Sequence, residues 1–477
     1  MSPEPSEPTS SELDFHFGTR AWTKLLVLCT AILFEGMSLS SINVQLAGIR
    51  GSLDLRPDQL QLVAGAFLAT YAGLLLVGGA CADRWGRRRM FLTGVALFGA
   101  SSLGASLAQE DVLLTVARAL QGVGAAVTAP AAVALIVTSF PEGAARNRAL
   151  GVFSAMGAAG FSLGVVVGGV LTEAFGWRAA FFLYVPLSLL VVALGTRVLD
   201  RDTTRSGTAR RRIAWPPALL ITGGLIAVVY TIGRLGTGSP AGIAVVGGTG
   251  LVATAAFFAT QARSPVPLLP PALMADRRVV ASCVALGSAF AAITGAMFLV
   301  ALDLQDRQGY SAMAAGLAFL PQGLAVGVLS TPAARLADRR PTTRLLLGGL
   351  AVIALGQLLY TTVQNGGYLT HLLPAALLVG GGIALTYPAA VMLTSSAASL
   401  DDQGTASGAL TAAQQAGGAL GVAAVTGLQS MAPGSFGTGT TGLWGCFGFA
   451  AVGLLGCSVL LLRGERSGAA LRGPEAG

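Results

Sequence analysis

Glu35 is the one acidic residue near the centre of any long apolar stretch of this sequence, within Phe34-Glu35-Gly36-Met37. A carboxylate in a low-dielectric interior binds its proton more tightly than it does in water, so it can take up and release a proton as its surroundings change. The residue type and its position therefore predict proton exchange at Glu35.

Arg118 is a cation within another apolar stretch, in Leu114-x3-Arg118-x2-Gln121-Gly122-x-Gly124. Moving a cation into hydrocarbon costs at least about 3 kcal/mol, so Arg118 should face an internal cavity and find a partner. The residues alone leave two roles open, a purely structural pairing and a response to the charge of a proton-exchanging carboxylate such as Glu35. The family resemblance described below implies the second.

Uncharged polar side chains within the apolar stretches could hydrogen-bond a bound molecule but could not carry a proton. Asp303 could contact a cationic substrate, although Asp306 and Arg307 follow at once and make a solvated helix end the alternative. A mostly apolar cavity with scattered amides suits a lipophilic or amphipathic molecule, while helix packing is the alternative for each amide. The predicted substrate-binding residues are Asn43, Gln45, Gln121, Gln322, Asp303 and Gln414.

The sequence lacks the residue patterns of an enzyme or a metalloprotein. It has two histidines and five cysteines with no Cys-x-x-Cys pair, and no phosphate-binding loop with a lysine. We therefore expect no metal, no cofactor, no enzymatic activity and no ATP-driven pumping. The basic residues occur in short clusters between apolar stretches, which argues against nucleic-acid binding.

The elements that must position these residues are membrane-spanning helices. Hydrophobic residues make up 53% of the chain and charged ones 11%, against about 25% charged in soluble domains, and the mean hydropathy is +0.70. A spanning helix needs about 20 apolar residues. Fourteen stretches meet this requirement, namely 24–47, 59–81, 90–108, 112–138, 148–172, 179–199, 213–235, 241–261, 279–303, 313–335, 344–363, 370–396, 404–428 and 442–462.

The distribution of basic residues sets the orientation, since Lys and Arg accumulate in cytoplasmic loops. With fourteen spans, most of the 30 Lys and Arg residues fall on the side of the two termini. We therefore predict that residues 1–20 and 463–477 are cytoplasmic tails.

The chain also repeats itself. The segment from Gly79 to Arg84 resembles the segment 334–339, and Gly160 and Gly164 have counterparts at Gly417 and Gly421. These repeats predict an all-α polytopic membrane protein with two pseudo-symmetric six-helix bundles, residues 21–199 and 279–462. Two additional helices lie between them at 213–262, entered through a basic cytoplasmic linker at 200–212.

The most specific motif is Gly79-x3-Asp83-Arg84-Trp85-Gly86-Arg87-Arg88-Arg89. Here the sequence resembles the major facilitator superfamily, whose signature loop GxxxDRxGRR occupies this location. The resemblance implies a conformational latch, while a simple positive anchor at the membrane surface is the alternative. The predicted latch residues are Gly79, Asp83, Arg84, Gly86 and Arg87, with Asp338 and Arg339 in the second copy.

A glycine-rich segment resembles the antiporter motif GxxxGPxxGG of this superfamily. Gly160, Gly164, Gly168 and Gly169 match it, and Val165 stands at the position of the family's proline. Glycines four residues apart allow a partner helix to approach closely.

Two further segments, Gly176-Trp177-Arg178-x2-Phe181 and Leu304-Gln305-x3-Gly309-Tyr310, resemble the fourteen-helix drug:proton antiporter branch. Helix 1 of that branch usually carries an Asp shortly before an Asn-Val pair. In this chain Ser38 stands near that position before Asn43, and Glu35 lies about one turn earlier.

The resemblance implies a monomeric transporter of the bacterial plasma membrane that exchanges protons for a small lipophilic or amphipathic organic compound and exports it. Its partners would be the substrate, protons and the lipid bilayer. An importer or facilitator of the same fold, or a membrane receptor or scaffold without transport activity, are the alternatives.

Overall fold

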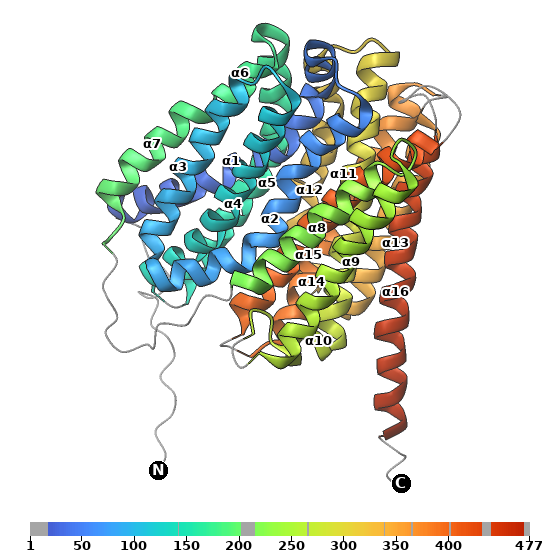
Figure 1. Ribbon diagram of the computed structural model, residues 1–477. Coiled ribbons are helices and arrows are strands. Elements are labelled where there is room, and N and C mark those ends of the chain that lie inside the picture. The colour runs from blue at the N-terminus through green and yellow to red at the C-terminus, as the bar shows by residue number, and fades with distance from the viewer. Residues whose placement is uncertain are drawn as a thin grey trace, which may run out of the picture.

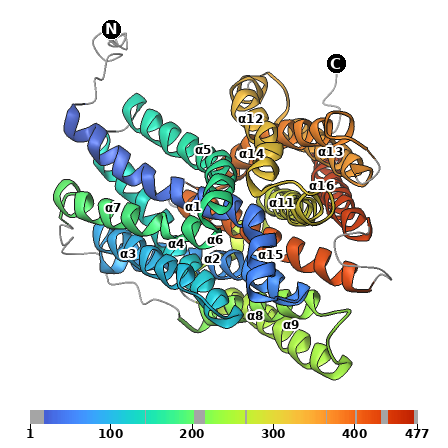
Figure 2. The same cartoon turned by 90° about the horizontal axis from the view of Figure 1, so that it is seen from above.

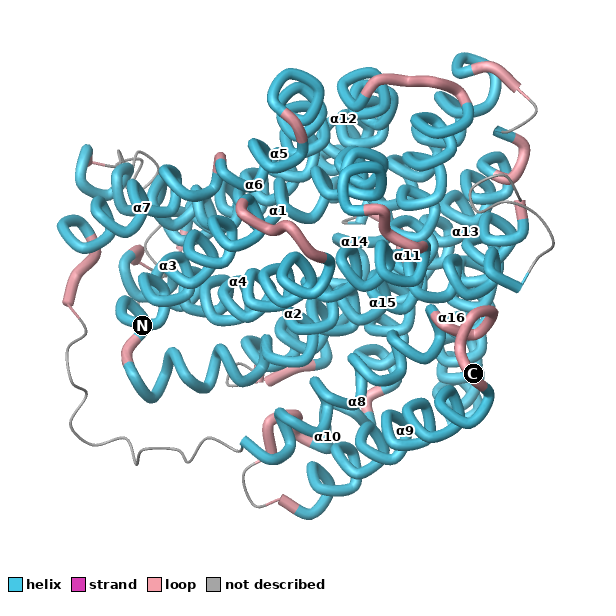
Figure 3. Tube along the Cα trace, turned by 45° about the horizontal axis from the view of Figure 1, so that its top comes forward, coloured by secondary structure: helices cyan, strands magenta, loops and turns pink. Residues whose placement is uncertain are grey.

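A computed structural model describes residues 18–141, 143–201, 215–264, 267–337, 339–363, 366–399, 402–431 and 440–471 of the chain. The described residues form helices joined by short loops, with no strand among them, as Figure 3 shows. Proximal is used below for the side of the bundle on which the first helix begins, and distal for the opposite side.

Helices of the described residues overlap each of the fourteen predicted stretches, and Figure 1 labels these helices. The sixth is divided at Leu183, because Pro186 has no backbone N–H to continue the helical hydrogen bonds. The bounds are α1 Thr19–Leu53, α2 Pro57–Trp85, α3 Arg87–Ser106, α4 Asp111–Ser139, α5 Ala144–Phe175, α6 Trp177–Phe182 with α7 Tyr184–Val198, α8 Trp215–Gly233, α9 Pro240–Arg263, α11 Arg277–Leu302, α12 Ala312–Ala337, α13 Thr342–Tyr360, α14 Leu373–Ala397, α15 Gln403–Met431 and α16 Thr441–Leu471.

Twelve spans in the described part of the chain are long and apolar enough to cross a membrane. The helices α3 and α15 are absent from this set. Three arginines at the start of α3, with Gly, Ser and Thr, lower its hydropathy, and Gly, Ser, Thr and Gln lower that of α15. The short helix α10 (Pro271–Ala275) and the π-helical segments η2 (Asp303–Arg307) and η4 (Tyr368–Leu372) adjoin the long helices. The chain is therefore an all-helical, multi-pass membrane protein.

Close helix contacts through small residues occur twice in the fold. Gly160 and Gly164 of α5 lie against the backbone carbonyls of α1 so closely that a Cβ atom would not fit, and Gly417 and Gly421 of α15 lie in the same way against α11. The contact of α3 with α4 through Gly94 and Thr128 likewise recurs between α13 and α14 through Gly349 and Thr386. These paired contacts support the internal repeat seen in the sequence.

Seen from above, α1–α7 gather on one side and α11–α16 on the other (Figure 2). The two groups meet where α2 runs along α15 and where α5 runs along α12. The helices α8 and α9 pack on each other, and α8 also contacts α2 and α15, at the edge of this junction.

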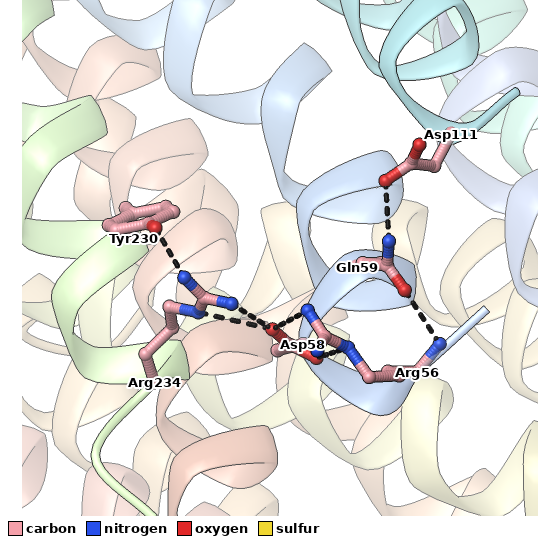
Figure 4. A network of polar contacts seen from close by, with 6 residues as sticks. All are labelled: Arg56, Asp58, Gln59, Asp111, Tyr230 and Arg234. Atoms are coloured by element: carbon pink, nitrogen blue, oxygen red, sulfur yellow. Dashed lines mark hydrogen bonds and ion pairs between the residues drawn. The ribbon is translucent and has the colours of Figure 1, made fainter. Parts of the chain in front are cut away.

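A polar network on the distal side ties α8 to α2 (Figure 4). Asp58, in the first turn of α2, is 5% exposed, and its Oδ2 accepts hydrogen bonds from Nη2 (2.8 Å) and Nε (3.1 Å) of Arg234 at the end of α8. Tyr230 accepts from Arg234 Nη1 at 2.6 Å, and Arg56 lies 3.4 Å from the same carboxylate. Gln59 extends the network to Asp111 of α4 at 2.6 Å.

We predict that Asp58→Asn loosens the attachment of α8 to α2. The substitution leaves the guanidinium of Arg234 without its counter-charge, and a hydrogen bond to a charged group contributes about 1.5–3 kcal/mol. The apparent melting temperature of the detergent-solubilised protein should fall by several degrees.

Arg56→Gln is the matched control. It removes an exposed cation from the same carboxylate, and exposed ion pairs contribute about 0–1 kcal/mol. Equal losses of stability in the two variants would contradict a specific tie between Asp58 and Arg234.

Candidate functional site

Glu35 lies in the interior of the bundle, in the middle of α1, with 3% of its surface exposed. Its Oε2 accepts a hydrogen bond from the hydroxyl of Tyr71 on α2 at 3.0 Å. Its Oε1 has no hydrogen-bond partner among the described residues. Because an unpaired carboxylate oxygen is costly to bury, this group is suited to hold a proton or to receive a hydrogen-bond donor.

Arg118 is more deeply buried, with 1% of its surface exposed. Its Nη1 donates to Ser38 Oγ at 2.8 Å and to Gln121 Oε1 at 2.9 Å, and Gln121 in turn donates to Ser102 Oγ at 2.7 Å. The guanidinium lies 4.8 Å from the ring centroid of Phe67. In the part of the chain that the structure describes, all these partners are neutral, so the positive charge of Arg118 has no contacting carboxylate.

Glu35 on α1 and Arg118 on α4 lie near each other, but the described contacts include no hydrogen bond or ion pair between them. Ser38, which binds Arg118, follows Glu35 by almost one turn of α1. On α2, Tyr71 binds Glu35 while Phe67 lies under Arg118, and these two rings are 5.7 Å apart in an edge-on arrangement. Acid and cation are therefore connected through an aromatic pair on one face of α2.

The predicted amide ligands have varied surroundings. Asn43 donates to the backbone of its own helix, at Ser40 O (3.3 Å), and both amide atoms of the fully buried Gln45 are unpartnered among the described residues. Gln322 accepts from the hydroxyl of Tyr360 at 3.3 Å, and Gln414 is partly exposed on α15. Gln121 is occupied by Arg118 and Ser102, as described above.

Asp303 lies away from this centre, at the distal end of α11. It is 5% exposed, and its two oxygens accept from Arg307 Nε (2.7 Å) and Gln308 Nε2 (2.8 Å). Neighbouring Asp306 pairs with Arg50, fifteen residues beyond Glu35 on α1, which corresponds to roughly 22 Å of helix. The structure therefore does not bring Asp303 together with Glu35.

Sequence reasoning did not identify Tyr71 as the partner of Glu35 or Ser38 as the partner of Arg118. Their pairing depends on the rotation of α1 against α2 and α4, which hydropathy alone does not define. One signal was available: Ser38 follows Glu35 by three residues, so the two lie on adjacent parts of one helix face.

The predicted latch residues surround the short turn between α2 and α3. Gly86 forms this turn with a φ of 100°, a conformation that L-residues with a side chain rarely adopt. Across it, Arg87 Nη2 donates to Asp83 Oδ1 at 3.3 Å. Gly79 is in van der Waals range of Pro130 on α4, and Arg84 lies at the end of α2. Arg339 is exposed, and Asp338 lies outside the described residues.

The glycines of α5 have two different partners. Gly160, Gly164 and Gly168 lie against α1, on the turns that carry Glu35 and the residues after it, whereas Gly169 lies against Ala312 at the start of α12. One helix therefore contacts both the carboxylate-bearing helix and the opposite group of helices.

The two groups of helices are joined on the distal side, both between α1 and η2 and between α5 and α12. Arg50 Nη1 lies 2.6 Å from Asp306 Oδ2, and Met313 N donates to Glu173 Oε2 at 3.1 Å. Farther toward the proximal side, a Cβ atom at Gly151 of α5 or at Gly327 of α12 would meet nothing within 4 Å. The described contacts thus join the two groups of helices on the distal side.

Comparisons with known proteins agree with this architecture. The model of the Major Facilitator Superfamily matches residues 28–422. The chain is 38% identical over 410 residues to the puromycin resistance protein of Streptomyces alboniger, covering 85% of this chain and 81% of the relative. It is 38% identical over 413 residues to the cephamycin export protein of Amycolatopsis lactamdurans, covering 84% of each.

Solved structures share the fold at low sequence identity. The POT family transporter PepTSo matches with a TM-score of 0.67 and 17% identity, and a D-xylose-proton symporter with 0.65 and 15%, each over 93% of this chain and 98% of the other. Together, the matched family model, the resistance and export relatives and the shared helical fold establish that this chain belongs to the major facilitator superfamily.

Proposed function

We propose that this chain is a proton-coupled antiporter that exports a small lipophilic or amphipathic organic compound by alternating access. The observation that carries the proposal is Glu35, a buried carboxylate near the boundary between the two groups of helices, with one oxygen unpartnered. The family is one of transporters rather than enzymes, and relatives of this chain are named for antibiotic resistance and export.

Proton exchange at Glu35 follows from the alternation of its surroundings. Where the path to one side of the membrane is open, water and substrate reach the carboxylate, and where it closes, the carboxylate is desolvated and retains a proton. The contacts of Arg50 with Asp306 and of Met313 with Glu173 support a conformation that is closed on the distal side. In this conformation substrate from the proximal side would enter as the proton leaves.

Arg118 would stabilise the deprotonated state of Glu35. Its described partners are neutral, so its charge remains available to the carboxylate of Glu35, which lies about one turn of α1 from Ser38. Electrostatic attraction acts over such a distance far more strongly inside a protein than in water. Arg118 is therefore assigned to proton coupling rather than to substrate contact.

The substrate-binding role is assigned to the predicted amides, which come from both groups of helices. Gln414 of α15 and Gln322 of α12 belong to one group of helices, and Asn43, Gln45 and Gln121 to the other. Asp303 is held by Arg307 and Gln308, which favours a structural role at the distal end for that carboxylate.

The topology that goes with this function has fourteen spans. Both α3 and α15 are packed within the bundle along α4 and α11, so they would cross the membrane with the twelve more apolar spans. Both termini would then be cytoplasmic, which makes the proximal side the cytoplasmic one in the plasma membrane. Residues 21–199 and 279–462 would form the two bundles of a monomer, with 213–262 as an added pair and 200–212 as the linker.

Conformational change would be guided by the α1–α5 contact and by the loop between α2 and α3. Gly160, Gly164 and Gly168 give α5 a smooth surface against α1. The exposed Asp83, paired only with Arg87 of its own loop among the described contacts, would be available to latch the proximal side when it closes.

Glu35→Gln should abolish substrate-triggered proton movement, because the amide cannot bind and release a proton. Inverted membrane vesicles with a preformed proton gradient would be exposed to lipophilic compounds, with puromycin as the first probe, while internal pH is recorded. Glu110→Gln is the matched control, since Glu110 is exposed and makes no capping hydrogen bond.

Proton release by the wild type and the control, but not by Glu35→Gln, supports the proposal. Release that persists in Glu35→Gln would remove Glu35 from the coupling. Substrate flux that is independent of any proton gradient would instead favour a facilitator, and proton movement in the same direction as substrate an importer.

Gly164→Ala should impair transport more than Gly151→Ala. A Cβ at Gly164 would overlap the carbonyl of Met37 and the hydroxyl of Ser40, and such overpacking costs about 1–3 kcal/mol. At Gly151 of the same helix the added methyl meets open space. Transport rates and melting temperatures of the two variants would be compared, and equal behaviour would refute a close α1–α5 contact during transport.

A further inference from the structure

We infer that Tyr71 is a positioning residue that sets the pH range over which Glu35 exchanges its proton. The inference rests on the proposed function of Glu35. Its basis is geometric: the hydroxyl of Tyr71, 3.0 Å from Oε2, makes the one hydrogen bond that the Glu35 side chain has among the described residues.

This hydrogen bond acts differently on the two forms of the carboxyl group. A hydroxyl that donates to a carboxylate stabilises the charged form more than the neutral acid. Since the other oxygen of Glu35 has no described partner, the anion depends on Tyr71 more than a solvent-exposed carboxylate would. Removing the hydroxyl would therefore delay proton release to higher pH.

Phe67 fixes the orientation of Tyr71. The two residues lie four positions apart on α2, and their rings meet edge-on with centroids 5.7 Å apart. Phe67 also lies under the guanidinium of Arg118 at 4.8 Å. The face of α2 thus presents a hydroxyl to the acid and a ring to the cation, and it holds the two charged groups at separate positions.

Tyr71 is also placed to sense movement of the opposite group of helices. Leu68 and Leu76, on either side of it along α2, contact Gly418 and Gly408 of α15. A displacement of α15 would therefore change the surroundings of the Tyr71–Glu35 hydrogen bond directly.

Few other ionisable groups face Glu35. Arg118 approaches from α4 through Ser38, and Tyr184 of α7 has its ring 6.3 Å from that of Phe34, next to Glu35. The described acidic and basic residues of α5, α11 and α12 lie at the ends of those helices. Tyr71 is the group among these that contacts the carboxylate, so it should have the largest effect on its titration.

The test is Tyr71→Phe in the full-length protein, reconstituted in vesicles, with puromycin-dependent proton movement recorded over a series of pH values. The pH of half-maximal proton release should rise by about one pH unit, the equivalent of a single hydrogen bond to a charged group. Tyr368→Phe is the control. It also removes a partly buried tyrosine hydroxyl, which donates to Ala318 O, and Tyr368 belongs to η4, in the other group of helices from Glu35. Its midpoint should match that of the wild type.

A second measurement removes the dependence on transport. The infrared band of the protonated carboxyl, identified as the band missing in Glu35→Gln, would be titrated in detergent for the wild type, Tyr71→Phe and Tyr71→Gln. The band should persist to higher pH in Tyr71→Phe, and Tyr71→Gln, which keeps a hydrogen-bond donor, should lie between the two.

The outcomes distinguish the role of Tyr71 from that of Glu35. An unchanged midpoint in Tyr71→Phe, in a protein where Glu35→Gln has lost the band and the proton coupling, overturns the role of Tyr71 alone. If the wild type and Glu35→Gln show the same carboxyl bands, the proposed function of Glu35 itself is overturned.

Discussion

The close approach of α5 to α1 determines how the centre of this protein is built. Gly160, Gly164 and Gly168 let the two backbones meet without intervening side chains, on the same turns of α1 that carry Glu35 and Ser38. In lipid, where no hydrophobic force draws helices together, such van der Waals contact is a principal source of association. The other faces of α1 are thereby turned toward α2 and α4, where Tyr71 and Arg118 provide polar partners.

The packing of the fold repeats, but its charges do not. Gly164 of α5 faces the carbonyl of Met37, and Gly421 of α15 faces that of Ala291 in the same way. Two residues before these carbonyls, the first helix has Glu35 whereas α11 has Ala289. Duplicated backbone contacts therefore support a symmetric movement, while the buried acid and cation remain in the group α1–α7.

Much of the fold was predictable from the sequence, because apolar stretches of spanning length bounded by charge depend on local composition alone. The predicted stretch 59–81 is contained within α2, and 112–138 within α4. The π-helical end of α11 at Asp303 was not predicted, since it depends on local backbone hydrogen bonding. The candidate site was predicted at the level of Glu35 and Arg118. Their partners Tyr71 and Ser38 required knowledge of how neighbouring helices are rotated.

The ion pair between Asp58 and Arg234 makes the additional helices α8 and α9 an integral part of the fold. Besides this ion pair, α8 covers Gly65 and Gly73 of α2 and lies against Gly427 of α15. Excising residues 213–262 to obtain a twelve-helix protein would uncover a buried carboxylate and expose glycine surfaces of both groups of helices to lipid. A fold of this type could lose or gain such a helix pair in evolution only along with compensating substitutions at the start of α2 and at the distal end of α15.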